Sequence, residues 1–357
     1  MQACGPVFRR FLCCCANGTG ASPPLNKKKK LVFLGSPKVA ASVLERLFNA
    51  SEAPDSAFQL AAIVTQPPSG RDRGRKLMPS PVAQHAIERG FPQDLIFTPE
   101  RAGEEAFLAD FRSLNPEICI TAAYGNILPT KFLNIAPYGT VNIHPSLLPL
   151  YRGAAPVQRA LQDGVTESGV SLVYTVRALD AGPIIAFERV EVDESIKAPE
   201  LLTLLFDLGS DLLIRELPSL FDGSAKLNAK PQDDSKATLA PKITSEESWL
   251  SFDQEARSLH NKVRAFAGWP GTRARVQIIG ENNNSNVLEI KVITTGICKT
   301  AGVDGDGNDI VFAGGSLLFP CAGPSLLEVR ELQLPGKKVM TARDFWNGLR
   351  GQKLKLV

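Results

Sequence analysis

The sequence predicts an α/β protein in which a mostly parallel sheet, with helices on both faces, is followed by a small closed β-barrel. The chain has 357 residues, whereas a single domain usually has about 100–200. Short apolar segments alternate with amphipathic ones as far as residue 222, and a polar, proline-containing stretch follows. We therefore predict a leader at 1–30, a first domain at 31–222, a linker at 223–247 and a second domain at 248–350.

The first domain begins with a predicted strand at 31–34, followed by a helix after Gly35. Ser36 is a suitable N-cap, with Pro37 at the first helical position. A strand, a turn and a helix in this order are typical of a Rossmann-like sheet. The G-x-G-x-x-G pattern is absent from this turn, so we expect this fold without dinucleotide binding.

The remaining elements follow from the period of the apolar residues. In the first domain we predict strands at 61–65, 116–124, 138–144, 171–176 and 184–192 and helices at 81–90, 154–161 and 200–221. In the second we predict a basic helix at 252–266 and strands at 274–279, 287–294, 309–313, 316–319 and 326–332. Short strands between glycine- or asparagine-rich turns are typical of a small closed barrel, here an OB-like one.

The strand at 138–144 carries the polar residues that stand out most. Asn142 and His144 are two apart and therefore point to the same side of a strand, whereas Val141 and Ile143 point to the other. The proline that follows ends the strand. In open α/β sheets ligands bind at such strand ends, so an amide and an imidazole side by side predict a functional site.

This segment resembles the signature of the folate-dependent formyltransferases. It reads Asn-x-His-Pro-Ser-Leu-Leu-Pro from Asn142, and Asp180 follows 36 residues after His144. The resemblance is greatest to the methionyl-tRNA formyltransferases and extends from about residue 31 to residue 350. The segments that carry it are 65–67, 73–82, 123–129, 151–158, 263–270 and 335–340.

The resemblance implies a site and a co-substrate. It implies that Asn142, His144 and Asp180 are catalytic and that the co-substrate is 10-formyltetrahydrofolate, with no metal. The residues implied to line the folate pocket are Ser146, Leu147, Leu148 and Pro149, together with Asn126, Ile127 and Leu128. From physical chemistry alone, the segment around Asn126 is equally compatible with a simple turn.

The three polar side chains suit acyl transfer to an amine. Attack on a formyl carbon places negative charge on oxygen, which Asn142 and a protonated His144 can stabilise as donors. Asp180 can hold His144 in one tautomer, favour its charged form and relay the proton. The structural alternatives are a core histidine, a turn cap at Asn142 and an Asx turn at Asp180.

The charge is distributed unevenly along the chain. The net charge is +3, and residues 1–30 hold six basic and no acidic residues, so the remainder is mildly acidic at −3. Phosphate contact requires positive charge, so nucleic-acid binding must depend on local patches. The basic loop at 70–77 is either a solvated surface loop or, as the resemblance implies, a grip on the tRNA acceptor arm. The predicted tRNA contacts are Arg71, Arg73, Arg75, Lys76, Arg264, Lys337 and Lys338.

The cysteines and the leader bear on the compartment. Four of the seven cysteines lie at Cys4 and 13–15, and no Cys-x-x-Cys pair is present, which argues against disulfides and a zinc site. An acid-free leader with Arg9 and Arg10 resembles a transit peptide, so we expect the mitochondrial matrix, with a plastid as the alternative. A disordered extension and palmitoylation of the cysteines at 13–15 also remain open. We expect no membrane span, because the apolar run in the leader is too short.

The leading hypothesis is formylation of initiator methionyl-tRNA for organellar translation, by a monomer. A second hypothesis keeps the chemistry but uses a small amine, such as glycinamide ribonucleotide or an amino sugar nucleotide. A third is a non-catalytic RNA-binding module that kept the fold. The basic loop at 70–77 and the added barrel favour tRNA, and the presence of Asn142, His144 and Asp180 favours catalysis.

Overall fold

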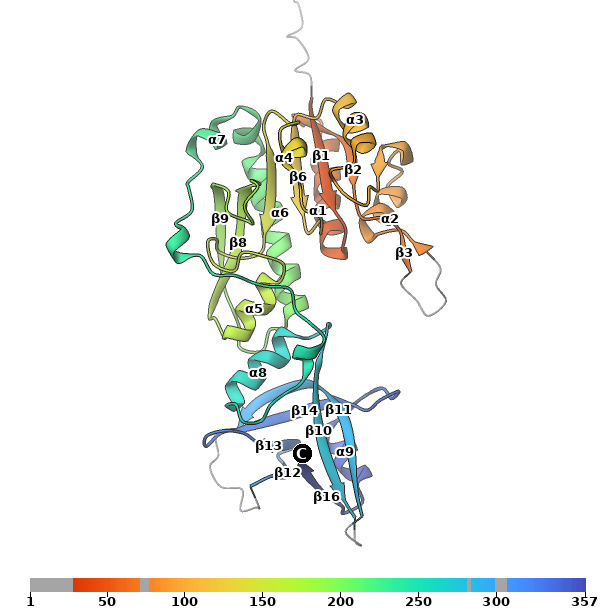
Figure 1. The fold of residues 1–357 in the computed structure, drawn as a ribbon, viewed down its shortest axis with the longest axis vertical. Coiled ribbons are helices and arrows are strands. Elements are labelled where there is room, and N and C mark those ends of the chain that lie inside the picture. The colour runs from red at the N-terminus through yellow and green to blue at the C-terminus, as the bar shows by residue number, and fades with distance from the viewer. Residues whose placement is uncertain (1–27, 71–76, 281–283, 299–306) are drawn as a thin grey trace, which may run out of the picture.

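The computed structural model describes residues 28–70, 77–280, 284–298 and 307–357. The predicted leader, at 1–30, lies almost wholly outside the described residues. A sheet domain with helices is joined through one helix to a β-barrel (Figure 1). The predicted fold class is confirmed.

The first sheet has seven strands in the order β5-β2-β1-β6-β7-β8-β9. The pairs from β5 to β7 are parallel, whereas β7–β8 and β8–β9 are antiparallel. Some adjacent strands, such as β1 and β6, are not consecutive in the chain, so the sheet brings segments that are distant in sequence to the same edge. The strands are β1 Lys29–Gly35, β2 Phe58–Val64, β5 Ile96–Phe97, β6 Ile118–Ala122, β7 Thr140–His144, β8 Glu167–Tyr174 and β9 Ile184–Glu191.

Helices cover both faces of this sheet because its central strands are apolar on both sides. Leu31 and Phe33 of β1 belong to the cluster packed against α1 and α6, whereas Val32 and Leu34 belong to the cluster packed against α3. The helices are α1 Lys38–Glu52, α2 Pro81–Glu88, α3 Glu105–Ser113, α4 Thr130–Leu133, α5 Pro156–Asp163, α6 Ala198–Phe221 and α7 Ser224–Asn228, with short 3₁₀ turns η1 Gln93–Leu95, η2 Asp234–Lys236 and η3 Glu246–Ser248.

Helix α6 lies directly beneath β7. A Cβ at Gly209 would lie 2.5 Å from Ile143 Cγ2 and 2.8 Å from Val170 Cγ2, so glycine permits this close approach. Val141 and Ile143 are buried at 0% and 1% exposure on this side of the strand. The alternation predicted for β7 therefore anchors its apolar face and turns Asn142 to the other.

The start of α1 differs from the prediction by one residue. Pro37, not Ser36, is the N-cap, and it has no side-chain cap. The Ser36 hydroxyl is engaged elsewhere: it donates to the Tyr124 carbonyl at 3.1 Å and accepts from the Gln66 amide at 3.2 Å. Ser36 thus links the loops that follow three neighbouring strands instead of capping the helix.

The second domain is a closed antiparallel barrel. Its strands run in the order β11-β10-β16-β12-β13-β14-β15, and an additional β11–β14 pairing closes a ring of six. Strand β16 pairs with both β10 and β12, so the predicted domain boundary at residue 350 is too early. The elements are α8 Ala256–Ala265, β10 Thr272–Ile279, β11 Ser285–Cys298, β12 Asp309–Ala313, β13 Ser316–Pro320, β14 Leu326–Gln333, β15 Val339–Thr341, α9 Ala342–Gly348 and β16 Lys353–Leu356.

Helix α8 joins the barrel to the sheet domain. The Arg264 guanidinium donates to the Asp193 carbonyl and to Asn261 Oδ1, both at 3.1 Å. Arg264 is 5% exposed, and burial lowers its pKa from the ordinary value. The prediction that Arg264 contacts tRNA is corrected, because its side chain is used within this junction.

His260 of α8 also lies in this junction. Its Nε2 donates to the Glu194 carbonyl at 3.1 Å and its Nδ1 lies 2.9 Å from Thr295 Oγ1. Burial lowers the pKa of His260 below 6.5, opposed by the bond to Glu194 and assisted by the charge of Arg264. The unfolded chain therefore binds more protons than the folded chain as the pH falls through about 6.5.

We expect the free energy of unfolding to decrease between pH 7.5 and pH 5.5, with part of this loss due to His260. The measurement is the urea midpoint at both pH values for the wild type and for His260→Gln. The variant should lose less stability on acidification. An identical loss in both proteins would remove His260 from this explanation.

Candidate active site

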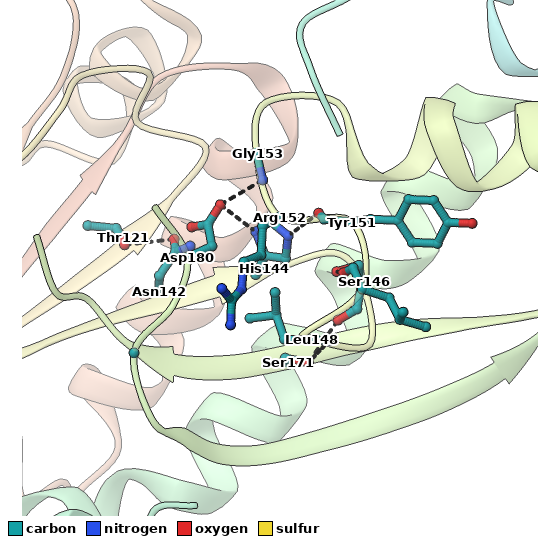
Figure 2. A network of polar contacts seen from close by, with 12 residues as sticks. Thr121, Asn142, His144, Ser146, Leu148, Tyr151, Arg152, Gly153, Ser171 and Asp180 are labelled. Atoms are coloured by element: carbon teal, nitrogen blue, oxygen red, sulfur yellow. Dashed lines mark hydrogen bonds and ion pairs between the residues drawn. The ribbon is translucent and has the colours of Figure 1, made fainter. Parts of the chain in front are cut away.

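Asn142 lies at the carboxyl end of the parallel part of the sheet, opposite Thr121 of β6. The Thr121 hydroxyl donates to Asn142 Oδ1 at 2.8 Å (Figure 2). In this orientation the amide oxygen of Asn142 is engaged by Thr121, and Nδ2 is the atom that can donate to a ligand. The same hydroxyl lies 3.3 Å from the Val141 carbonyl, so the neighbouring strand holds the amide in place through Thr121.

His144 ends β7 and is 3% exposed. Its Nε2 lies 2.9 Å from the Tyr151 carbonyl. A carbonyl can only accept, so Nε2 carries the hydrogen and Nδ1 is the ring atom that gains or loses a proton. Nδ1 lies 3.7 Å from Asp180 Oδ2, which is within ion-pair reach but longer than a hydrogen bond (Figure 2).

Asp180 is brought to His144 from the turn between β8 and β9. Its Oδ2 accepts a hydrogen bond from the Gly153 amide at 2.9 Å. The backbone of Asp180 is left-handed, with φ of 46°, and Tyr151 is left-handed too, at 59°. Such conformations are uncommon outside glycine and concentrate at functional sites. The turn at 151–153 thereby presents one carbonyl to the imidazole and one amide to the carboxylate.

The sequence-based expectation that Asp180 selects the tautomer of His144 needs correction. The Tyr151 carbonyl selects it, and Asp180 faces the atom that changes protonation. The Tyr151 ring points away from His144 (Figure 2), and its hydroxyl donates to Asp163 at 3.0 Å. Burial, together with Asp163, raises the pKa of Tyr151 to about 12, so the phenol stays protonated.

Two of the four residues predicted to line the folate pocket from the Ser-Leu-Leu-Pro loop hold the loop itself. The Ser146 hydroxyl donates to the Leu150 carbonyl at 2.6 Å, and Ser146 is 1% exposed. Ser171 donates to the Ser146 carbonyl and accepts from the Leu148 amide. Ser146 and Leu148, which is 7% exposed, therefore help to hold the loop, and their contact with folate stays a prediction. Leu147 and Pro149 are half-buried, so they keep accessible surface.

The other predicted part of the pocket is the loop after β6. Asn126 Nδ2 donates to the Glu100 carbonyl at 3.0 Å, which ties the loop down. Ile127 is 91% exposed, whereas Leu128 packs against the core beneath β6. Ile127 and Leu128 thus present apolar surface beside the strand end, with the polar Asn126 next to them, and contact of these three residues with folate stays a prediction.

The predicted tRNA contacts are spread over both domains. Arg71, Arg73, Arg75 and Lys76 lie outside the described residues, between the paired segments β3 Ser69–Gly70 and β4 Leu77–Met78. Lys337 and Lys338 are exposed in the turn between β14 and β15. In the described part of the chain no group of three or more metal-ligating side chains gathers, and no helix there is long and apolar enough to span a membrane.

The fold and this strand end define a formyl transferase. A family model described as "Formyl transferase" matches residues 29–217, and one described as "Formyl transferase, C-terminal domain" matches residues 242–350. Relatives with curated names indicate which kind of formyl transferase the chain resembles. A "Methionyl-tRNA formyltransferase" of Thermotoga maritima is 36% identical over 323 residues, covering 90% of this chain and 95% of the relative. One of Kosmotoga olearia is 34% identical, covering 91% and 97%.

The chain belongs to the methionyl-tRNA formyltransferase family of enzymes. Solved structures agree in fold. A sugar 3N-formyl transferase, solved with dTDP and 5-N-formyl-THF, has a TM-score of 0.59 at 15% identity, covering 87% of this chain and 99% of that one. An N-formyltransferase from Helicobacter canadensis has a TM-score of 0.56 at 16% identity, covering 84% and 98%.

Proposed function

We propose that this protein transfers the formyl group of 10-formyltetrahydrofolate to the amino group of initiator methionyl-tRNA. The observation that supports this most is the convergence of Asn142, His144 and Asp180 at one strand end, with Nδ1 of the histidine 3.7 Å from the carboxylate. The family membership supports the acceptor, since relatives that match about nine tenths of the chain carry that name.

In the proposed reaction the amino nitrogen of methionine forms a bond to the formyl carbon, and the C=O π pair moves to oxygen. Asn142 Nδ2 and a protonated His144 Nδ1 donate to this oxyanion. Asp180 takes the proton of the attacking nitrogen. The oxyanion pair then re-forms the C=O bond as the bond from carbon to the folate nitrogen breaks, and that nitrogen receives the proton from Asp180, so atoms and charge balance.

The folate is proposed to lie between the two loops that flank the end of β7. Leu147 and Pro149 supply half-buried surface from one loop, and Ile127 and Leu128 supply apolar surface from the other. Such a mixture suits a flat ring whose edges carry polar atoms.

The leader supports the further proposal of a mitochondrial location, with a plastid as the alternative. Residues 1–30 carry six basic and no acidic residues, which is typical of transit peptides. A fusion of this segment to a fluorescent protein should enter the organelle. Cytosolic fluorescence from the fusion would contradict the proposal.

The acceptor is tested by offering the purified enzyme 10-formyltetrahydrofolate with initiator methionyl-tRNA, elongator methionyl-tRNA or glycinamide ribonucleotide. We expect formyl transfer to initiator methionyl-tRNA. Transfer to the ribonucleotide alone would establish the small-amine alternative. No transfer to any acceptor, with tRNA still bound, would point to an RNA-binding module.

Reversing the charge of the basic loop should weaken the tRNA reaction. We expect the triple variant Arg73→Glu, Arg75→Glu and Lys76→Glu to raise the KM for tRNA by about tenfold or more, because it replaces attraction to phosphates by repulsion. Lys226→Glu on α7, exposed and outside the predicted tRNA contacts, is the control. An equal loss of transfer to a small amine would contradict this role of the loop.

A further inference from the structure

Part of the predicted linker is bound to both loops of the candidate site. We call residues 230–240 the strap. At its start, Lys230 and Ile184 exchange two backbone hydrogen bonds of 2.8 and 2.9 Å. Farther along, the backbone amide of Arg152 donates to the Thr238 carbonyl at 2.9 Å. The backbone carbonyl of Arg152 accepts from the Ala240 amide at 2.7 Å. The strap thus bridges the loop that carries Asp180 and the loop that contacts His144.

Gln232 is the side chain of the strap that reaches both loops. Its Nε2 donates to the carbonyls of Asp180 at 2.7 Å and Gly182 at 2.8 Å. Its Oε1 accepts from Arg152 Nε at 3.0 Å and from Nη2 at 2.7 Å. Both amide hydrogens and both lone pairs of the amide oxygen are used, so the orientation of this side chain is fixed.

Arg152 is held at this place by burial and charge. It is 8% exposed, and its Nη2 also pairs with Asp234 at 2.8 Å. It lies between Tyr151, whose carbonyl accepts from His144, and Gly153, whose amide donates to Asp180. Any shift of Arg152 therefore moves both of these backbone contacts.

Apolar packing holds the Asp180 turn weakly. Leu179, the residue before Asp180, is 63% exposed, and residues 176–178 are exposed as well. Gly182 is pressed against β8, since a Cβ there would lie 1.7 Å from the Tyr174 carbonyl. The turn is thus confined at Gly182, and at Asp180 its backbone is held by Gln232.

We propose that Gln232 is a positioning residue for formyl transfer, which sets the distance between Asp180 and His144 by joining the two loops. The proposal rests on the proposed function of this site. Gln232 does not touch the reacting atoms; it acts through the Asp180 carbonyl and through Arg152.

The test is Gln232→Glu, which keeps the size of the side chain and an acceptor for Arg152. It replaces the amide donor by a carboxylate oxygen that faces the carbonyls of Asp180 and Gly182. Repulsion should displace the Asp180 turn, and displacement of a catalytic group by about 1 Å can cost about 100-fold. We expect kcat to fall by about 10- to 100-fold, with the KM for both substrates changed by less than about twofold. Gln93→Glu, the same substitution at an exposed position of η1 outside this network, should keep kcat within about twofold.

A double-mutant cycle separates positioning from general damage. If Gln232 acts through Asp180, then Gln232→Glu should lower kcat by less than about threefold in an Asp180→Asn background. Losses that add fully would overturn the proposal, and so would a kcat for Gln232→Glu equal to that of the wild type. Should Gln232→Glu fold poorly by its urea midpoint, Gln232→Ala, which removes the donor without adding charge, enters the same cycle with the same expectations.

The cycle also separates this proposal from the proposed function. A wild-type rate for Asp180→Asn would contradict the assigned site itself. An impaired Asp180→Asn, together with an unimpaired Gln232→Glu, would contradict the role of Gln232 alone.

Discussion

His144→Ala should lower the single-turnover rate of formyl transfer by about 10²- to 10⁴-fold. The variant removes Nδ1, the ring nitrogen that faces Asp180. The other ring nitrogen, Nε2, is hydrogen bonded to the Tyr151 carbonyl. Without Nδ1 the developing oxyanion loses a charged donor. The measurement is formation of formyl-methionyl-tRNA under saturating enzyme.

The control for this variant is His85→Ala. His85 lies on α2, with Nε2 2.8 Å from Glu45 Oε2, and it touches neither site loop. Its rate should stay within about twofold of the wild type. Equal rates in the two alanine variants, with urea midpoints showing both folded, would exclude His144 from the chemistry.

Asn142→Ala should lower the same rate by about 10²- to 10³-fold, the usual cost of removing one oxyanion donor. Thr121 holds the amide in place beside the strand end, which limits its reorganisation when charge develops. The KM values should change little, because the lost interaction strengthens only as charge develops in the transition state.

Thr121→Val provides a graded comparison for Asn142. It keeps the amide and removes the hydroxyl that orients it, so a smaller loss than in Asn142→Ala is expected. A full rate in Asn142→Ala, or a greater loss in Thr121→Val than in Asn142→Ala, would contradict the assignment of Asn142 as the donor.

Much of the fold could be predicted because its signals are periodic and local. The alternation in β7 predicted which side of the strand carries Asn142 and His144, and α6 indeed covers the other side. Strands β15 and β16 have only three and four residues, so their periods are too short to recognise. Arg264 was misassigned because a basic helix looks solvated in sequence, whereas α8 packs at a junction that sequence alone does not reveal.

The site was predicted less completely, for a physical reason. The groups that orient His144 and Asp180 are a backbone carbonyl at Tyr151 and a backbone amide at Gly153, and every residue type has these groups. Gln232 lies 52 residues from Asp180 in a segment with the composition of a linker. Only the folded structure, in which Gln232 donates to the Asp180 carbonyl, shows that this residue belongs to the site.

The most direct test of the central claim is the single-turnover rate of formyl transfer to initiator methionyl-tRNA by Asp180→Asn. Asparagine has nearly the same shape and tolerates the left-handed backbone found here, with φ of 46°, so the fold should persist. The proposed mechanism predicts a loss of about 100-fold or more, because the carboxylate charge and its proton relay are gone. A rate within about threefold of the wild type would contradict it.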